Sequence, residues 1–301
     1  MKEVKITVIG SINMDLVTKT SVSPNQGETV MGESFFSIPG GKGANQAVAA
    51  ARLGARVKMV GRVGSDAFGH ELLDNLSKEG ISIDSVEPVT HTSTGIASIT
   101  LSEGDNRIIV VPGANFEVTP EVIQQYEDLI ATSDMILLQL EIPLESVEEA
   151  VKLAKKHNRK VILNPAPIQK LPKALLKDVD YLTPNEHELR LLLSDLDLSE
   201  GEVEEIKSKC IVTKGASGIS YYDGRENVVP SHKVDVVDTT GAGDSANGAL
   251  AVAMSSGLSV KAACEFANAV GALSVTKLGA QSGMPTRQEV EDFLFHKRGD
   301  K

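Results

Sequence analysis

Short apolar runs alternate with longer amphipathic segments along most of the chain. The apolar runs are nearly continuous, as is typical of parallel strands that are buried on both faces. They cover residues 4–10, 57–63, 134–141, 161–164 and 210–213. The amphipathic segments predict helices over residues 45–53, 67–78, 121–131, 145–157 and 244–256. The alternation predicts an α/β fold in three layers, with a mostly parallel sheet between helices on both faces.

Two regions depart from this alternation. Residues 16–38 mix β-branched with polar residues, and residues 94–111 predict a hairpin that turns at residues 103–106. We expect both regions to form a small antiparallel sheet apart from the main one. Such a sheet must bury one face, so it is a candidate lid or oligomer surface; the alternative is a decorated edge of the main sheet. We therefore expect one domain over residues 1–301 that carries a β lid.

The composition argues against several classes of function. With 301 residues the chain can bury a full core without disulfides. It carries 30 Lys and Arg against 41 Asp and Glu, a net charge of −11, and this balance disfavours binding to nucleic acid or to anionic membrane surfaces. An anionic ligand would therefore need local binding charge or a metal ion.

The cysteines and the hydropathy pattern indicate the compartment. Cys210 and Cys264 lie far apart and have no metal-ligand spacing, so we expect both to be buried as small apolar residues. The sequence has no apolar run near the ~18 residues of a membrane span, and residues 1–10 lack a signal-peptide cleavage site. We expect a soluble, cytoplasmic protein.

A first glycine-rich stretch surrounds Lys42. Gly40, Gly41 and Gly43 lead directly into an alanine-rich helix start, where free backbone N–H groups, a helix dipole and a cation suit an oxygen-rich ligand. The alternative is a tight turn that lets the helix pack on a strand. The stretch is not a Walker A loop, because Gly43 follows the lysine where Ser or Thr should stand.

A second glycine-rich stretch spans residues 238–244. Gly241, Ala242 and Gly243 open a long helix and leave unpaired N–H groups that predict an anion hole. Asp244 follows, so a carboxylate could contact a hydroxyl while the amides contact a phosphoryl group. Helix capping is the alternative for Asp244, but it does not explain the residues before it. Beside a helix N-terminus, we expect the pKa of Asp244 to lie below its ordinary value.

Further polar residues follow the predicted strands. Asn13 and Asp15 come after the first strand, Glu141 ends the third, and Asn185 and a glycine-rich turn at residues 214–218 follow later ones. In an open α/β sheet the carboxyl ends of the strands meet at one crevice. The sequence has no G-x-G-x-x-G fingerprint and no nucleophile elbow. The pattern predicts a site for a polyhydroxylated molecule beside a phosphate donor.

The motifs at residues 10–15, 40–46, 163–167, 183–186 and 238–244 resemble those of the PfkB-type carbohydrate kinase family. The resemblance runs from Lys5 to about Leu294, and Gly-Ala-Asn-Gln at residues 43–46 is typical of members that act on ribose. It implies ATP-dependent phosphorylation of the 5-hydroxyl of D-ribose. It also implies a β lid that pairs with the lid of a second subunit, giving a homodimer.

The resemblance implies a role for each matching residue. Asp244 would be the general base, and Gly241, Ala242 and Gly243 would form the anion hole. The residues implied in sugar binding are Asn13, Met14, Asp15, Gly41, Lys42, Gly43, Ala44, Asn45, Glu141 and Asp244. Those implied in ATP binding are Asn185, Thr213, Lys214, Gly215, Ala216, Ser217, Gly218, Gly243, Asp244 and Asn268.

Two kinds of cation follow from the same resemblance. Mg²⁺ would accompany ATP, and a monovalent cation, K⁺, would activate the enzyme next to the anion hole. The residues implied in holding the monovalent cation, mostly through backbone carbonyls, are Asp238, Thr240, Ser274, Lys277, Gly279 and Gly283.

The sequence departs from the family pattern at two places. Ser245 and Ala246 replace the usual Thr-Phe, and Asn268 stands where a histidine often flanks adenine. A related kinase that acts on deoxyribose, another pentose or a nucleoside is one alternative, and a sugar or nucleotide sensor without catalysis is another. The intact residues 241–244 argue against the sensor.

Overall fold

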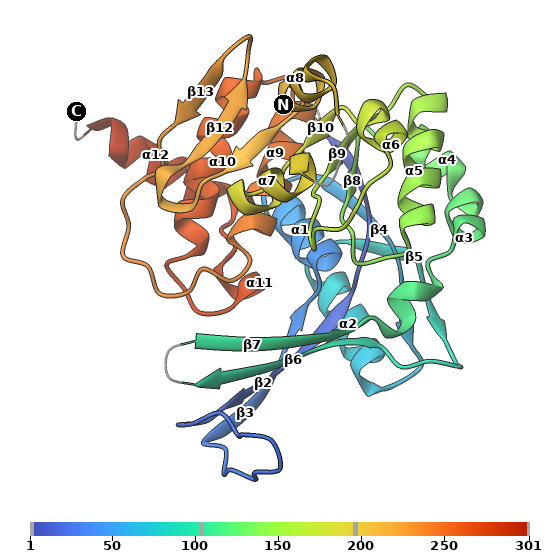
Figure 1. Ribbon diagram of the computed structural model, residues 1–301, viewed down its shortest axis with the longest axis vertical. Coiled ribbons are helices and arrows are strands. Elements are labelled where there is room, and N and C mark those ends of the chain that lie inside the picture. Colours follow the sequence, from blue (N-terminus) through green and yellow to red (C-terminus); the bar gives the residue numbers. More distant parts are fainter. Residues whose placement is uncertain (1–2, 103–104, 195–197, 300–301) are drawn as a thin grey trace.

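The computed structural model describes residues 3–102, 105–194 and 198–299. At its centre is a six-stranded sheet in the order β10-β9-β8-β1-β4-β5, and every pairing in it is parallel (Figure 1). The strands are β1 (Lys5–Ile9), β4 (Arg56–Gly64), β5 (Ser82–Val89), β8 (Met135–Leu138), β9 (Lys160–Leu163) and β10 (Tyr181–Leu182). The predicted α/β class is confirmed.

Helices cover both faces of this sheet. Alternate side chains of its strands point to opposite faces, and each face packs against helices in its own apolar cluster. Ile6 and Val8 belong to one cluster and Ile9 to the other. The first cluster includes residues of α1 (Lys42–Arg52), α2 (Ala67–Lys78), α9 (Ala242–Ser255), α10 (Val260–Ser274) and α12 (Arg287–Gly299). The second includes residues of α3 (Pro120–Gln125), α4 (Glu127–Ala131), α5 (Leu144–Lys156), α6 (Lys173–Asp178), α7 (Glu186–Ser194) and α8 (Glu200–Ser208).

The observed helix bounds agree closely with the sequence pattern, with two differences. The helix predicted over residues 121–131 is broken at Tyr126, whose backbone (φ −104°, ψ 22°) separates α3 from α4. The helix predicted from residue 45 begins at Lys42, because Gly41 adopts φ 89° and turns the chain directly into α1. The second difference moves Lys42 and Gly43 from a loop into the first turn of a helix.

A second sheet of three strands lies beside the edge of the main one. It is formed by β11 (Ile211–Thr213), β12 (Ile219–Tyr222) and β13 (Glu226–Val229). Residues 210–213 were expected to join the parallel sheet, but β11 pairs antiparallel with β12. Among the described residues, two isolated parallel bridges, Leu182 to Cys210 and Asn185 to Thr213, connect it with the β10 edge.

The expected lid is a four-stranded sheet that projects from the main body (Figure 1). It consists of β2 (Asn13–Lys19), β3 (Ser34–Gly40), β6 (Gly95–Ser102) and β7 (Asp105–Val111), in the order β3-β2-β6-β7. The β2–β3 and β6–β7 pairs are antiparallel, whereas β2 and β6 meet in parallel. Of the predicted hairpin turn at residues 103–106, residues 103–104 lie outside the described ranges.

Three short elements complete the fold. They are the 3₁₀ turns η1 (Gly113–Glu117) and η2 (Gly215–Ser217) and the short helix α11 (Ala280–Gly283). In the described ranges, no helix has the length and apolar content needed to cross a bilayer. Cys210 and Cys264 are buried and unpaired, and burial raises the pKa of each thiol to about 12.

Candidate active site

The start of α1 packs directly against the turn between β1 and β2. A Cβ added to Gly43 would lie 2.6 Å from the Ser11 amide nitrogen, so only glycine permits this approach. The Ala44 amide donates to the Ser11 carbonyl at 2.9 Å. The tight-packing interpretation of this stretch is therefore correct.

The backbone amides at the start of α1 are already used inside the protein. Lys42 N donates to Glu141 Oε2 at 3.1 Å, and Gly43 N donates to Ser11 Oγ at 3.2 Å. Ser11 Oγ in turn donates to the same Glu141 oxygen at 2.5 Å. The expectation of free amides at this helix start is wrong, because Ser11 and Glu141 take them.

Lys42 is surrounded by carboxylates. Burial lowers the pKa of its ammonium, but the negative charges of Asp244, Glu141, Glu188 and Asp15 outweigh burial and raise it. Lys42 is therefore a stable cation at a site with four acidic residues. The predicted residues Asp15, Glu141 and Asp244 do converge, because each acts on the same lysine.

Asp15 is the acid most affected by this crowding. Its pKa rises to about 7, chiefly because of burial and then because of the charges of Glu141 and Asp244. A Cβ on Gly40 would lie 2.4 Å from Asp15 Oδ2, so this glycine leaves room for the carboxyl group. Asn13, at the start of β2, accepts a hydrogen bond from Asn115 Nδ2 at 2.7 Å.

The start of α9 differs from that of α1. Gly241 adopts φ 75°, and a Cβ there would lie 2.8 Å from the Ala280 Cβ, whereas a Cβ on Gly243 would point into open space. Over the ranges that the structure describes, no acceptor takes the amides of Gly241 and Gly243. Ala242 N donates to Thr239 O at 3.2 Å. The predicted anion hole thus retains two free amides of three.

Asp244 is buried at the start of α9, with 8% of its surface exposed. Asn45 Nδ2 donates to its Oδ2 and Gln46 Nε2 to its Oδ1, each at 3.0 Å. The expected lowered pKa is wrong: burial raises the pKa of Asp244, although Lys42 and the two amides oppose that change. Desolvation of the carboxylate outweighs the helix N-terminus, and the higher pKa makes Asp244 a stronger base.

The predicted nucleotide side lies between α7 and the three-stranded sheet. Asn185 Oδ1 accepts from Glu188 N at 2.8 Å, and Glu188 Oε2 accepts from Asn185 N at 2.8 Å, as in a capping box. The turn of residues 214–218 follows β11, and Lys214 Nζ is paired with Glu226 at 2.6 Å. Asn268 Nδ2 donates to Val229 O at 2.8 Å, so this amide holds the segment after β13.

The residues predicted to hold a monovalent cation also lie together. Asp238 Oδ1 accepts from Thr240 N at 2.9 Å, and its Oδ2 accepts from Gly279 N at 2.8 Å. Burial raises the pKa of Asp238, but these hydrogen bonds outweigh burial and lower it. A Cβ on Gly283 would lie 2.3 Å from the Ser274 carbonyl oxygen and 3.6 Å from that of Lys277. Carbonyl oxygens and one anionic carboxylate therefore meet beside the anion hole.

Sequence reasoning missed two residues of this site. Gln46 contacts Asp244 directly; it belongs to the Gly-Ala-Asn-Gln motif at residues 43–46, but the motif alone assigned no role to this glutamine. Glu188 was also missed, although its spacing of three residues from Asn185 is that of a capping box. Burial raises the pKa of Glu188, and the charges of Lys42 and Asp244 reach it.

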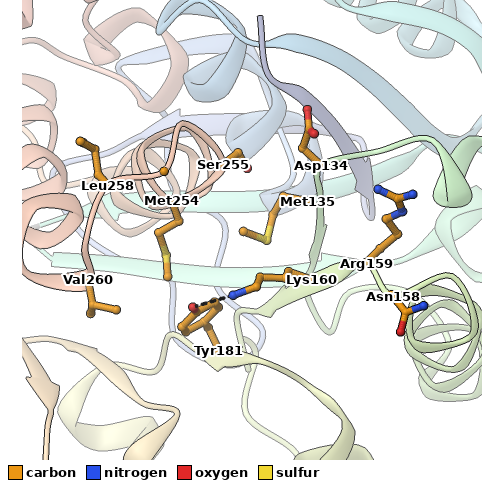
Figure 2. A pocket seen from close by; sticks show the side chains of 11 residues that line it. Asp134, Met135, Asn158, Arg159, Lys160, Tyr181, Met254, Ser255, Leu258 and Val260 are labelled. Carbon is orange, nitrogen blue, oxygen red and sulfur yellow. Dashed lines mark hydrogen bonds between the residues drawn. The ribbon is translucent and has the colours of Figure 1, made fainter. Parts of the chain in front are cut away.

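A separate pocket lies at the opposite end of the main sheet. Figure 2 shows Asp134, Lys160 and Tyr181 at its wall, which are residues at the amino ends of β8, β9 and β10. Leu258 and Met254, from the end of α9 and the turn after it, line another side. None of the predicted site residues lines this pocket, so it is distinct from the site around Asp244.

Comparisons with known proteins agree with this geometry. The pfkB family carbohydrate kinase model matches residues 4–287. A ribokinase of Bacillus subtilis is 50% identical over 290 residues, covering 96% of this chain and 99% of that protein, and one of Lactococcus lactis is 46% identical over 292 residues, covering 96% and 97%. The structure of an Arabidopsis thaliana ribokinase complexed with ribose and ATP superposes with a TM-score of 0.88 at 32% identity, covering 98% and 99% of the two chains. The chain therefore belongs to the pfkB family of carbohydrate kinases.

Proposed function

We propose that the protein transfers the terminal phosphoryl group of ATP to the 5-hydroxyl of D-ribose in the cytoplasm. The single observation that carries the proposal is the start of α9, where the buried carboxylate of Asp244 stands beside the free amides of Gly241 and Gly243. A base next to an anion hole is what phosphoryl transfer to a hydroxyl requires. The similarity to ribokinases of Bacillus subtilis and Lactococcus lactis supports ribose as the acceptor.

Two acidic residues, Asp15 in β2 and Glu141 after β8, would bind the sugar beside the start of α1. Asp15 and Glu141 offer carboxylate oxygens to neighbouring hydroxyl groups, and Asn45 offers its amide. The sugar site in this proposal consists of Asn13, Met14, Asp15, Gly41, Lys42, Gly43, Ala44, Asn45, Glu141 and Asp244. Hydroxyl groups that donate to carboxylates stabilise the ionised acids, which lessens the repulsion among them.

Asp244 would accept the proton of the attacking hydroxyl. Its raised pKa strengthens it as a base, and the amides from Asn45 and Gln46 keep its two oxygens in fixed positions. The amides of Gly241, Ala242 and Gly243 would stabilise the charge on the transferred group, and Lys42 would add a positive charge. Positioning and charge stabilisation supply most of the acceleration in such reactions.

ATP would bind against Asn185, Asn268 and the turn from Thr213 to Gly218; the bridge between Asn185 and Thr213 supports this, because it brings two of these segments together. The residues present fit a magnesium ion carried by ATP, because Glu188, whose charge interacts with Lys42 and Asp244, offers a carboxylate oxygen at the site. Within the described ranges, no cluster of three His, Cys, Asp or Glu could hold a metal alone, so phosphate and water would supply most ligands. Bound Mg²⁺ would neutralise phosphate charge.

The residues around Asp238 fit a monovalent cation such as K⁺. The carbonyl oxygens of Ser274 and Lys277 lie near Gly283, and Asp238 stays anionic because Thr240 and Gly279 donate to it. Uncharged carbonyls with a single carboxylate suit a weakly hydrated ion. Bound K⁺ would stabilise the loop that ends at the anion hole and add positive charge beside it.

The β lid would pair with the lid of a second copy of the chain. All four residues of Ile108–Val111 in the edge strand β7 are exposed, with Ile109 69% exposed, and Phe35 in β3 is 65% exposed. An exposed apolar edge strand is a template for association. Sedimentation of Ile109→Asp should then give a monomer, while the matched change Phe295→Asp on α12 should leave the dimer intact.

A coupled assay of ADP release tests the proposed reaction. Ribose should support turnover with Mg²⁺, potassium should increase the rate, and deoxyribose, fructose and adenosine should be poorer acceptors. Faster turnover of deoxyribose, another pentose or adenosine would reassign the acceptor within the family. Sugar binding without ADP release from any of them would contradict catalysis and support a sensor.

A further inference from the structure

A chain of buried side-chain amides lies behind Asp244. Gln46 has no exposed surface, and its Nε2 donates both to Asp244 Oδ1 at 3.0 Å and to Asn164 Oδ1 at 3.2 Å. Its Oε1 accepts from Gln139 Nε2 at 2.7 Å. We refer to Asn164, Gln46 and Gln139 as the amide chain. It joins the residue after β9, the first turns of α1 and the residue after β8.

One backbone carbonyl, that of Thr183, determines where the nitrogen and the oxygen of each amide side chain in this chain lie. Asn164 Nδ2 donates to Thr183 O at 2.9 Å, and a carbonyl oxygen can only accept. Asn164 must therefore turn its Oδ1 toward Gln46, which in turn must present Nε2 and keep Oε1 for Gln139. A flipped Gln46 would place its oxygen against the Asp244 carboxylate, so the network permits only a donor at that carboxylate.

The far end of the chain is held by packing. Gln139 has no exposed surface, and among the described residues its Oε1 has no hydrogen-bond partner. A Cβ on Gly10 would lie 1.9 Å from that oxygen, so the missing side chain at Gly10 leaves room for Gln139. A buried polar atom without a partner is costly, which indicates that Gln139 is kept for its Nε2 donor to Gln46.

Thr183 also connects the amide chain to the anion hole. Its Oγ1 donates to Asn247 Oδ1 at 2.5 Å, and Asn247 Nδ2 donates to the Gly243 carbonyl at 2.9 Å. Thr183, the residue after β10, thus fixes both the orientation of Gln46 and the peptide that follows Gly243. The carboxylate and the anion hole are held by one continuous set of hydrogen bonds.

We propose that Gln46 is a positioning residue, which through its fixed amide aims the Asp244 carboxylate at the sugar hydroxyl and keeps it ionised. The inference rests on the proposed role of Asp244 as the base. Gln46 differs from Asn45, the other donor to Asp244, in its amide hydrogens: Gln46 Nε2 donates to both Asp244 and Asn164, whereas Asn45 Nδ2 donates to Asp244 alone among the described residues and keeps one N–H for a ligand. Asn45, by contrast, is assigned to the sugar site, so changes to the two residues should separate in ribose KM and kcat.

Gln46→Leu tests the proposal, since leucine has a similar size and no donor. We expect kcat to fall about 10- to 100-fold while the KM values for ribose and ATP change less than about 2-fold. Removal of a donor to the ionised form raises the pKa of Asp244, so the acid limb of the kcat/KM profile should move to higher pH by about one unit. Gln46→Glu, which adds a second acid, should move the limb further in that direction.

Other charges that act on Asp244 stay in place in these variants. Lys42 favours its ionised form, and Glu141 opposes it, while Asp15 and Glu188 complete the surrounding acids. A shift of the acid limb in Gln46→Leu therefore reports the lost amide. Thr7→Val is the control for the loss of a buried polar pair, because the hydroxyl of Thr7 in β1 bonds that of Ser133 at 2.7 Å. This variant should lower the free energy of unfolding and leave the acid limb unchanged.

The outcomes separate this inference from the proposed function. A folded Gln46→Leu with the kcat and acid limb of the wild type overturns the inference, even when Asp244→Asn is inactive. An active Asp244→Asn overturns the proposed base itself. If Gln46→Leu does not fold, Asn164→Leu decides the matter, because it removes the acceptor that fixes the direction of the Gln46 amide without touching Asp244. It should shift the limb in the same direction by a smaller amount, and an unshifted limb rejects the inference.

Discussion

The two glycine-rich helix starts of this protein have similar sequences and opposite uses. At α1 the glycines allow backbone to touch backbone, and the amides of Lys42 and Gly43 are taken by Glu141 and Ser11. At α9 the amides of Gly241 and Gly243 have no acceptor among the described residues, and Gly243 faces open space. In the proposed reaction the first start would present side chains to the sugar, and the second would present backbone donors to a phosphoryl group.

This difference teaches that a glycine-rich helix start is not by itself an anion site. A helix start can bind an external anion only when the surrounding residues do not already accept hydrogen bonds from its amides. At α1 the acceptor is Glu141, a carboxylate, so the helix start binds an internal anion and fixes that anion's position. At α9 the nearest carboxylate, Asp244, is held by the side chains of Asn45 and Gln46 and leaves the amides free.

The largest expected effect is the loss of the base at α9. Asp244→Asn should lower kcat by ~10²-fold or more, because general-base contributions are typically ~10² to 10⁴. The KM values for ribose and ATP should change little, since asparagine keeps the shape of the side chain. Steady-state ADP release measures both. Turnover close to that of the wild type would remove Asp244 from the chemistry.

The next largest effect is expected for alanine substitutions at Gly43 and Gly243, which form a matched pair because each lies in the first turn of its helix. Gly43→Ala places a methyl group 2.6 Å from Ser11 N and should reduce the free energy of unfolding by about 2–3 kcal/mol. Gly243→Ala meets open space and should leave that free energy unchanged or raise it by up to ~1 kcal/mol. Urea unfolding of the two variants checks the contrast. Equal destabilisation would mean that the two helix starts are packed alike.

Asp15 gives the smallest of the three effects, and it depends on pH. Its folded pKa of about 7 lies above its ordinary value of 3.8, so between these values the folded state holds a proton that the unfolded state has lost. Stability from this group is therefore present at low pH and lost as pH rises toward 7. Asp15→Asn should remove this dependence and exceed the wild type by about 2 kcal/mol at pH 8, allowing for partial exposure.

Urea unfolding at pH 5 and pH 8 measures the advantage of Asp15→Asn. It should be clearly larger at pH 8 than at pH 5. An advantage that shrinks between pH 5 and pH 8 would show that burial and the charges of Glu141 and Asp244 do not raise the pKa of Asp15. The same measurement with ribose present should reduce the advantage, because the sugar hydroxyls would stabilise the ionised carboxyl.

Most of the fold could be predicted from local patterns. The helix at residues 67–78 was predicted with its observed bounds, because Asp66 caps it and its apolar residues repeat with helical spacing. Residues 210–213 were expected in the parallel sheet; they form two parallel bridges beside the β10 edge, but β11 pairs antiparallel with β12, and an apolar run of four does not reveal that partner. The parallel pairing of β2 with β6 in the four-stranded sheet could not be predicted either, because these two strands are far apart in sequence.

The sequence predicted which acidic and basic residues converge, but it did not predict the pKa of Asp244 or its hydrogen bond with Gln46. Asp15, Lys42, Glu141 and Asp244 converge as expected. The pKa of Asp244 was predicted in the wrong direction, because burial depends on the whole tertiary structure and not on the helix start alone. Gln46 was missed for the same reason: its partners Asn164 and Gln139 come from distant strands.

Amide hydrogen exchange tests the central comparison most directly. In the free protein the amide of Gly243 should exchange near its intrinsic rate, and those of Lys42 and Gly43 should be protected by Glu141 and Ser11. Addition of ribose, Mg²⁺, ADP and aluminium fluoride, which imitates the transferring phosphoryl group, should slow exchange at Gly241 and Gly243 at least about 10-fold and leave Lys42 and Gly43 unchanged. New protection at Lys42 and Gly43, with none at Gly241 and Gly243, would contradict the account.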